Sequence, residues 1–174
     1  MVRILNAGAG ADTYGTDWID AYPQRSEIKK VDMNKDRFPY KDNTFDEVYS
    51  KQVFAHLRNH EHFLKESYRV LKKGGKIVLT TDNAGFFGLV RGTHHGDYDK
   101  IVSKGKLDKC YGLFTTQHIR NWLEWAGFKN IRAEYAFLPI KKKSILLKLQ
   151  RGLFRIVSIF SDKIKPNIMA TGVK

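Results

Sequence analysis

The sequence predicts an α/β fold, and three observations carry that prediction. Strand-like and helix-like stretches alternate along the 174 residues. A glycine-rich turn follows directly after a short apolar stretch at residues 2–7. This pattern is typical of a buried strand that ends close to a bound ligand. Two later stretches place their apolar residues at helical spacing. The length fits a single domain, and we expect one domain over residues 1–174.

Seven stretches of the sequence are predicted as strands of the sheet. In residues 76–81 the run Ile77-Val78-Leu79 is continuously apolar, as in a strand covered on both faces. The other predicted strands are similar short apolar runs that are bounded by turn-forming residues. The predicted strands are 2–7, 16–21, 28–33, 45–50, 76–81, 128–137 and 167–173.

Two helices are predicted between the strands. Residues 61–73 carry an apolar stripe with Asn59 as N-cap and Gly74-Gly75 as the stop. Residues 117–126 carry a second stripe, with Thr115 or Thr116 at its start and Gly127 at its end.

Two further segments have no simple assignment. Residues 83–114 are rich in glycine and too long for an ordinary connection, so we expect an insertion on the substrate side of the domain. Residues 141–165 form a basic amphipathic segment. Helix packing on the sheet, contact with an anionic membrane and contact with a partner subunit all remain open for it.

Composition narrows the class. The net charge is +13, and residues 129–174 hold eleven Lys and Arg against two acidic residues, which suits either a solvated basic face or a polyanionic partner. Cys110 is the only cysteine, so no internal disulfide and no cysteine-rich zinc site is expected. We expect a cytoplasmic protein without a signal peptide or membrane helix and without a metal, and attachment to the membrane surface is the alternative.

The feature that points to function is the turn Asn6-Ala7-Gly8-Ala9-Gly10. Glycines there allow backbone to approach a ligand at the carboxyl end of the strand. Thr13 stands where a dinucleotide fingerprint would have its third glycine, and no phosphate-loop pattern is present. This favours a nucleoside-like cofactor without a pyrophosphate.

An acidic partner for a ribose is available at the end of the next strand. Asp20 ends residues 16–21, and a carboxylate there can accept hydrogen bonds from both ribose hydroxyls. Asp17 competes for this role, but strand alternation and the end position favour Asp20. Asp32 ends the third strand, where either an adenine contact or a turn role is open.

The order of these motifs resembles the class I S-adenosylmethionine-dependent methyltransferases, among their small generic members of the type 11 kind. The resemblance spans nearly the whole chain. It is carried by the glycine turn, by Asp20, by Val31-Asp32-Met33, and by the run Phe38-Pro39-Tyr40-Lys41-Asp42-Asn43-Thr44-Phe45-Asp46-Glu47-Val48. Phe54-Ala55-His56-Leu57, Arg69-Val70-Leu71, Gly74-Gly75-Lys76 and Ala126-Gly127-Phe128 extend it.

This resemblance implies a Rossmann-like class I methyltransferase fold. The expected sheet is mostly parallel and seven-stranded with an antiparallel last strand, and the helices of the N-terminal half are abbreviated because Gly10 and Asp20 lie close together in sequence. The implied cofactor is S-adenosyl-L-methionine. The residues expected to bind it are Ala7, Gly8, Ala9, Gly10, Asp20, Asp32, Met33 and Ser50.

The implied reaction is in-line transfer of a methyl group to an O or N acceptor, in which orientation supplies much of the rate. A general base could assist. The candidates are His56, His94, His95 and Tyr111, with Asp97 beside them. For the adjacent His94 and His95, the alternative interpretation is that they are solvent-exposed loop residues without a catalytic role.

The acceptor is not readable from the sequence. A small molecule, glycan or lipid-linked compound is the first expectation. An RNA or protein acceptor bound through the basic C-terminal surface, or a non-catalytic binding subunit, are the alternatives. The turn Tyr49-Ser50-Lys51-Gln52 lacks the pattern of enzymes that methylate base amino groups, and Cys110 is misplaced for cytosine methylation. Because the abbreviated helices leave the site open, a second copy of the chain could complete it, so a homo-oligomer is a further alternative.

Overall fold

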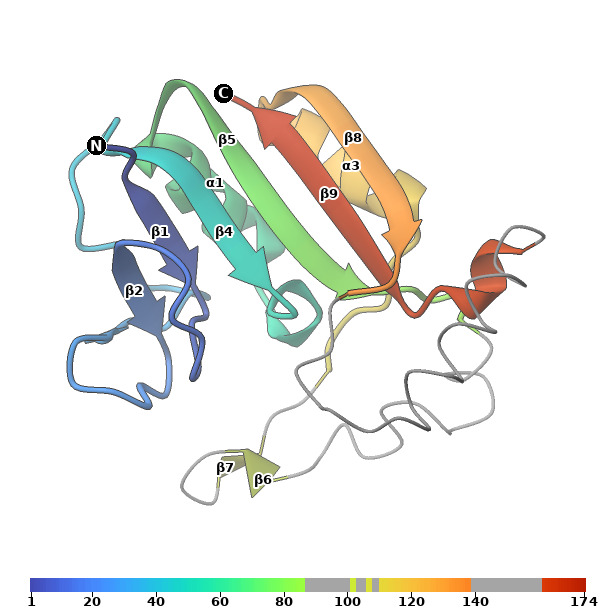
Figure 1. The fold of residues 1–174 in the computed structure, drawn as a ribbon, viewed down its shortest axis with the longest axis horizontal. Coiled ribbons are helices and arrows are strands. Elements are labelled where there is room, and N and C mark those ends of the chain that lie inside the picture. The colour runs from blue at the N-terminus through green and yellow to red at the C-terminus, as the bar shows by residue number, and fades with distance from the viewer. Residues whose placement is uncertain (87–100, 103–105, 108–109, 139–160) are drawn as a thin grey trace.

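The computed structural model describes residues 1–86, 101–102, 106–107, 110–138 and 161–174 of the chain. Its centre is a seven-stranded sheet with the strand order β3-β2-β1-β4-β5-β9-β8 (Figure 1). The strands are β1 Ile4–Ala7, β2 Asp17–Asp20, β3 Lys29–Lys30, β4 Phe45–Lys51, β5 Leu71–Asp82, β8 Lys129–Ala136 and β9 Asn167–Val173.

The sheet is mostly parallel, as predicted. β1 pairs in parallel with β2 and β4, β2 with β3, and β4 with β5. β9 runs antiparallel between β5 and β8. The carboxyl ends of the parallel strands therefore meet at one edge, which is where ligands bind in open α/β sheets. A separate two-stranded hairpin, β6 Ile101–Val102 with β7 Lys106–Leu107, lies beyond that edge in Figure 1.

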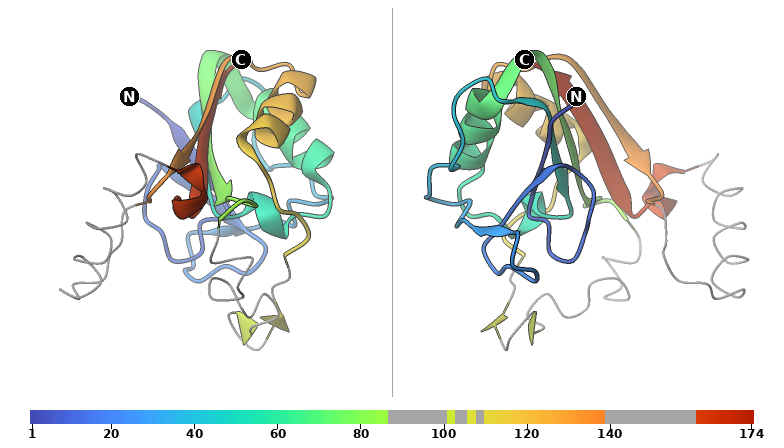
Figure 2. Two further views of the ribbon diagram at one scale, coloured as in Figure 1. Left: turned by 90° about the vertical axis from the view of Figure 1, so that its right-hand side faces the viewer. Right: turned by 60° about the vertical axis from the view of Figure 1, so that its left-hand side comes forward.

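Two α-helices pack on the same face of the sheet (Figures 1 and 2). Helix α1, His60–Val70, begins at Asn59, whose side chain accepts a hydrogen bond from the His62 amide, as the predicted N-cap requires. Helix α3, Thr116–Trp125, begins at Thr115, which forms a capping box with His118. Gly127, with φ +93°, follows its end.

The predicted end of the first helix is wrong. The helix was expected to reach residue 73 and to stop at Gly74-Gly75, but α1 ends at Val70 and β5 begins at Leu71. Leu71 is fully buried and pairs with Phe45 of β4, so burial in the sheet overrides helix propensity there. The two glycines lie within β5 instead, where Gly74 has φ +77° and a Cβ on Gly75 would lie 3.0 Å from the Lys72 carbonyl oxygen.

The N-terminal half contains no α-helix between β1 and β4 in residues 8–44, all of which the structure describes. β3 was predicted over residues 28–33 but keeps only two residues. It stops early because Asp32 starts a turn, with its Oδ1 accepting a hydrogen bond from the Asn34 amide at 3.0 Å. The edge of the sheet that includes β2 and β3 is therefore built from short strands and tight turns.

One hydrophobic core joins the sheet to the two helices. Its largest fully buried side chains include Phe38, Phe45, Phe54, Phe63 and Phe128. Along β1 and β4 the buried Leu5 and Val48 are paired neighbours on the helix-covered face. Burial of these apolar side chains supplies the main stabilisation of the sheet.

Most of residues 83–114 and of the basic segment 141–165 lie outside the described residues. Their predicted roles as a substrate-side insertion and a basic amphipathic segment stay predictions. Within the described part of the chain, no helix is long and apolar enough to span a bilayer.

Candidate functional site

The site begins at the turn between β1 and β2. Gly8 has φ +86° and Gly10 has φ +50°, conformations that glycine adopts without strain. The amides of Gly8 and Ala9 both donate to the carbonyl oxygen of Ile19, at 2.9 and 3.2 Å. A Cβ on Gly8 would lie 2.1 Å from the Val53 Cγ2 atom, so only glycine lets the turn pack against the segment after β4.

Asp20 lies directly across from this turn. Its Oδ2 accepts a hydrogen bond from the Gly10 amide at 2.8 Å, and its Oδ1 accepts one from the Tyr22 amide at 2.7 Å. Each carboxylate oxygen can accept a further hydrogen bond, so two hydroxyls can still be bound. Asp17, the sequence competitor, forms an ion pair with Arg3 at 2.8 Å and does not line the cavity described below.

Asp32 and Met33 follow β3 at the same edge. Burial alone would raise the pKa of Asp32, but the hydrogen bonds from the Asn34 side chain and amide, together with nearby Lys35 and Arg58, lower the pKa of this carboxyl. Asp32 is therefore an ionised acceptor at neutral pH. Met33 is buried and supplies an apolar contact surface beside it.

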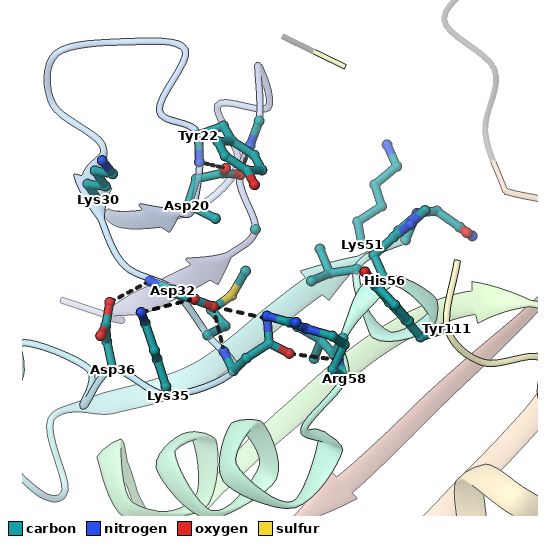
Figure 3. A pocket seen from close by; sticks show the side chains of 18 of the residues that line it. Asp20, Tyr22, Lys30, Asp32, Lys35, Asp36, Lys51, His56, Arg58 and Tyr111 are labelled. Carbon is teal, nitrogen blue, oxygen red and sulfur yellow. Dashed lines mark hydrogen bonds and ion pairs between the residues drawn. The ribbon is translucent and has the colours of Figure 1, made fainter. Parts of the chain in front are cut away.

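A cavity of about 730 Å³ connects these residues with the end of β4 (Figure 3). Gly8 and Gly10 line it, and a Cβ on Gly10 would meet no atom within 4 Å, so open space lies directly in front of the turn. The other lining residues are Asp20, Ala21, Tyr22, Gln24, Lys30, Asp32, Met33, Asn34, Lys35, Asp36, Lys51, Gln52, Val53, His56, Leu57, Arg58 and Tyr111.

The structure brings most of the predicted site residues together in this cavity: Gly8, Gly10, Asp20, Asp32, Met33, His56 and Tyr111 all line it. Ala7, Ala9 and Ser50 do not, because their side chains are buried in the protein. Ser50 Oγ has no hydrogen-bond partner among the described residues. His94, His95 and Asp97 lie outside the described residues.

Several lining residues were not predicted. Lys51 ends β4 and Gln52 follows it, and their position at the carboxyl end of a central parallel strand is the signal that could have found them. Gln52 has φ +57°, unusual for a residue other than glycine, and its amide donates to the Thr80 carbonyl oxygen at 2.9 Å. Arg58 reaches the cavity through the turn after the 3₁₀ helix η1, Phe54–His56, and no sequence pattern marks it.

A loop connects β1 to β2, where a helix is usual in this type of fold. The Tyr14 carbonyl oxygen accepts hydrogen bonds from the Asn6 side chain at 3.1 Å and from the Trp18 indole at 3.0 Å. The Tyr14 hydroxyl donates to Glu47 at 2.8 Å, and burial together with this bond raises the pKa of Tyr14 to about 12. This loop therefore holds the glycine turn against the sheet without a helix.

The donor set suits a nucleoside-like ligand. The cavity offers backbone at a glycine turn, a carboxylate with acceptor capacity left over and a buried methionine, and no group of three His, Cys, Asp or Glu side chains in the described part of the chain could hold a metal ion.

Comparison with known proteins agrees with this chemistry. Residues 5–79 match the family model described as "Methyltransferase domain". This part of the chain is a class I S-adenosylmethionine-dependent methyltransferase domain. This confirms the family predicted from the glycine turn and the motifs after it, and with the family its methyl donor, S-adenosylmethionine.

The relatives of this methyltransferase are distant. It is 28% identical over 144 residues to protein MJ1123 of Methanocaldococcus jannaschii, covering 81% of this chain and 67% of that one. It is 29% identical over 108 residues to phosphoethanolamine N-methyltransferase 3 of Arabidopsis thaliana, covering 62% of this chain but only 20% of the plant enzyme. The chain thus spans about a fifth of that relative.

A solved structure confirms the fold. The S-adenosylmethionine-dependent methyltransferase of Mesorhizobium loti aligns over 99% of this methyltransferase and 91% of its own chain, with a TM-score of 0.63 and 17% sequence identity. At this identity the likeness shows the fold alone.

Proposed function

We propose that this methyltransferase binds S-adenosylmethionine in the cavity at the glycine turn and transfers its methyl group to an O or N acceptor. The observation that carries the proposal is Asp20, fixed by the Gly10 and Tyr22 amides at the mouth of an open space. The family supplies the donor, and the cavity of about 730 Å³ is large enough for a nucleoside-sized ligand with room beside it.

Each part of the site has a role in this proposal. Asp20 accepts hydrogen bonds from the two ribose hydroxyls, Asp32 accepts from the adenine amino group, and Met33 packs on the ring. The backbone of Gly8 and Gly10 lies along the methionine part, where a side chain would block it.

When bound, the donor would present a methyl group on a sulfonium; the acceptor lone pair would form a bond to the methyl carbon as the carbon–sulfur bond breaks, and its electrons would leave with sulfur. The protein's contribution is to hold the acceptor in line with that bond and to exclude water. If the acceptor is a hydroxyl or an ammonium group, its proton must also leave. His56, which lines the cavity beside Tyr111 in Figure 3, is the described residue we assign to that step.

The acceptor we favour is a small molecule, a glycan or a lipid-linked compound. Residues 8–44 form an open wall without a helix, which leaves the acceptor side accessible to a compound of moderate size. The missing helix also favours a second candidate for the functional site, in which a partner chain supplies the residues that complete the cavity.

Thermal unfolding tests the cofactor. We expect S-adenosylmethionine and S-adenosylhomocysteine at about 100 times their dissociation constants to add roughly 2.7 kcal/mol of stability, a shift of about 5–10 °C, and NAD to add nothing. Asp20→Ala should abolish the shift. Asp17→Ala is the matched control, because it removes a carboxylate from the same strand but outside the cavity, and it should keep the shift.

The outcomes separate the candidates. A shift with NAD alone, or an undiminished shift in Asp20→Ala, would refute the proposed site. Absence of any shift in the isolated chain, restored by an added partner protein, would support the partner-completed site instead.

A further inference from the structure

The two walls of the cavity differ in their acidic residues, although Lys30 and Lys35 lie on the acidic wall (Figure 3). All the acidic residues that line it, Asp20, Asp32 and Asp36, lie on the wall built by residues 20–36. The opposite wall is built by the end of β4, by η1 and by the segment before α3. Its charged or hydrogen-bonding side chains include Lys51, His56, Arg58 and Tyr111, and no Asp or Glu lines it among the described residues. We call these four residues the cationic wall, after the positive charges of Lys51 and Arg58.

The carboxylates of the first wall are already engaged. Asp20 accepts from two backbone amides, and Asp36 accepts from the Asp32 amide at 2.8 Å. Asp32 accepts from Asn34 and lies 3.9 Å from the Lys35 ammonium group. Their hydrogen bonds are made within the first wall, although Asp32 also lies close enough to Arg58 for the two charges to attract each other.

Arg58 and Tyr111 form the outer part of the cationic wall. The guanidinium carbon of Arg58 lies 5.9 Å from the centre of the Tyr111 ring. Their backbones are fixed, since the Arg58 amide donates to the Asn34 side chain at 2.7 Å and the Tyr111 amide donates to the Ala55 carbonyl oxygen at 2.7 Å.

The side-chain ends of this pair are free to bind a ligand. Tyr111 is 52% exposed, and Arg58 is also exposed. Among the described residues, the Arg58 guanidinium contacts the Tyr111 ring and is attracted by Asp32, and no hydrogen bond to another described side chain holds it or the Tyr111 hydroxyl. An arginine fork beside a phenol suits a planar or tetrahedral anion.

Lys51 forms the inner part of the cationic wall. Its ammonium group lies 3.6 Å from an Asp12 carboxylate oxygen, and both side chains are partly exposed, at 34% and 23%. A pair of this length in contact with solvent contributes little, so a better placed anion can replace Asp12.

We propose that the cationic wall binds a negatively charged group of the methyl acceptor, a phosphate or a carboxylate. The proposal rests on the proposed function, because it assigns to the acceptor the part of the cavity that the methyl donor leaves. Arg58 and Tyr111 bind the anion, and Lys51 draws it toward the glycine turn. An acceptor with a net positive charge is disfavoured by the same side chains.

The test uses the protein saturated with S-adenosylhomocysteine, so that the donor's own carboxylate already occupies its place. Calorimetric titration at constant ionic strength then compares inorganic phosphate, succinate and ethanolamine. We expect phosphate or succinate to bind and ethanolamine not to bind. The stronger of the two anions identifies the phosphate or the carboxylate as the recognised group.

Variants locate the binding. Arg58→Met and Lys51→Met should each weaken anion binding about tenfold or more, since each removes a charged hydrogen-bond donor. Arg58→Lys should recover part of it. Lys65→Met is the matched control, because Lys65 is an exposed lysine of α1 whose ion pair with Glu61 lies away from the cavity, and it should bind as the parent protein does.

Three results would overturn the inference: ethanolamine binding in place of the anions, anion binding only without S-adenosylhomocysteine, or anion binding that Arg58→Met and Lys51→Met leave unchanged. These results differ from failure of the proposed function, in which S-adenosylhomocysteine itself would not bind.

Discussion

The guanidinium group of Arg120, on α3, donates hydrogen bonds to the carbonyl oxygens of Ile131 and Ala133 on the edge strand β8, at 3.1 and 3.0 Å. Carbonyl groups of an edge strand are open to pairing with another chain. Arg120 occupies two of them from within the protein and so covers part of this edge.

We therefore predict that Arg120→Met lowers the free energy of unfolding by about 1–3 kcal/mol, the range for hydrogen bonds to a charged group. The variant should also self-associate at concentrations where the parent protein does not. Urea unfolding and sedimentation velocity measure the two effects. Arg120→Lys keeps the charge but loses the fork, so it should also lower the free energy of unfolding, and a lysine variant as stable as the parent protein would contradict the role given to the two bonds.

Gly8 is predicted to tolerate no side chain, for two separable reasons. Gly8→Ala should cost about 1–2 kcal/mol for the left-handed backbone and a further 1–3 kcal/mol for the collision with Val53. Val53→Ala in the same chain should recover the second part only. A double-mutant cycle from urea unfolding measures this coupling, and strictly additive effects would refute the collision.

His60 is predicted to make stability depend on pH near neutrality. Burial lowers the pKa of His60 from its ordinary 6.5, and the hydrogen bond with the Phe54 carbonyl oxygen offsets this only in part. The unfolded chain therefore binds the proton more tightly. The free energy of unfolding should be largest above about pH 6.5 and should fall as the pH drops toward the folded pKa, with a slope of at most about 1.4 kcal/mol per pH unit.

The variant His60→Phe checks this. The imidazole packs among Phe54, Phe114 and Trp122, so a phenyl ring keeps most of these contacts. Its unfolding free energy should vary less between pH 5 and 7 than that of the parent protein. Parallel profiles would show that His60 does not contribute.

Glu66 is predicted to contribute in acid. Burial would raise the pKa of Glu66, but the hydrogen bonds from Arg69 and from the Phe38 amide lower it from the ordinary 4.5. Its stabilisation is present above about pH 4.5 and is lost as the pH falls through the folded pKa.

Glu66→Gln should thus cost about 1–3 kcal/mol at pH 7, because the side chains of Glu66 and Arg69 are only 12% and 16% exposed. The difference from the parent protein should shrink toward pH 3. Urea unfolding at several pH values measures it, and a constant difference would count against an ionised Glu66.

Much of the fold was predictable because local signals and tertiary structure agree. Asn59 and Thr115 cap their helices as expected, and β9 has the predicted bounds. The helix end at Val70 was missed because Leu71 is drawn into the sheet beside Phe45, a contact between residues far apart in sequence.

The site divides in the same way. The glycine turn and Asp20 are recognisable because their roles require particular residue types at strand ends. Lys51 and Arg58 are ordinary surface residues in the sequence, and only the folded chain places them on one cavity. Ser50 was expected at the cofactor on family resemblance, yet its side chain faces the protein interior.

Because residues 8–44 contain no helix, the edge strands β2 and β3 are expected to unfold locally more easily than the centre of the sheet. β2 and β3 are short and are joined to the rest mainly through β1. Segments with few buried contacts exchange their amide hydrogens through local unfolding. A ligand that contacts Asp20, the glycine turn and the end of β4 would connect β2 and β3 to the central strands and stabilise them. We therefore expect ligand binding and local folding of β2 and β3 to be one thermodynamic event, so that the same residues that recognise the cofactor depend on it for their order.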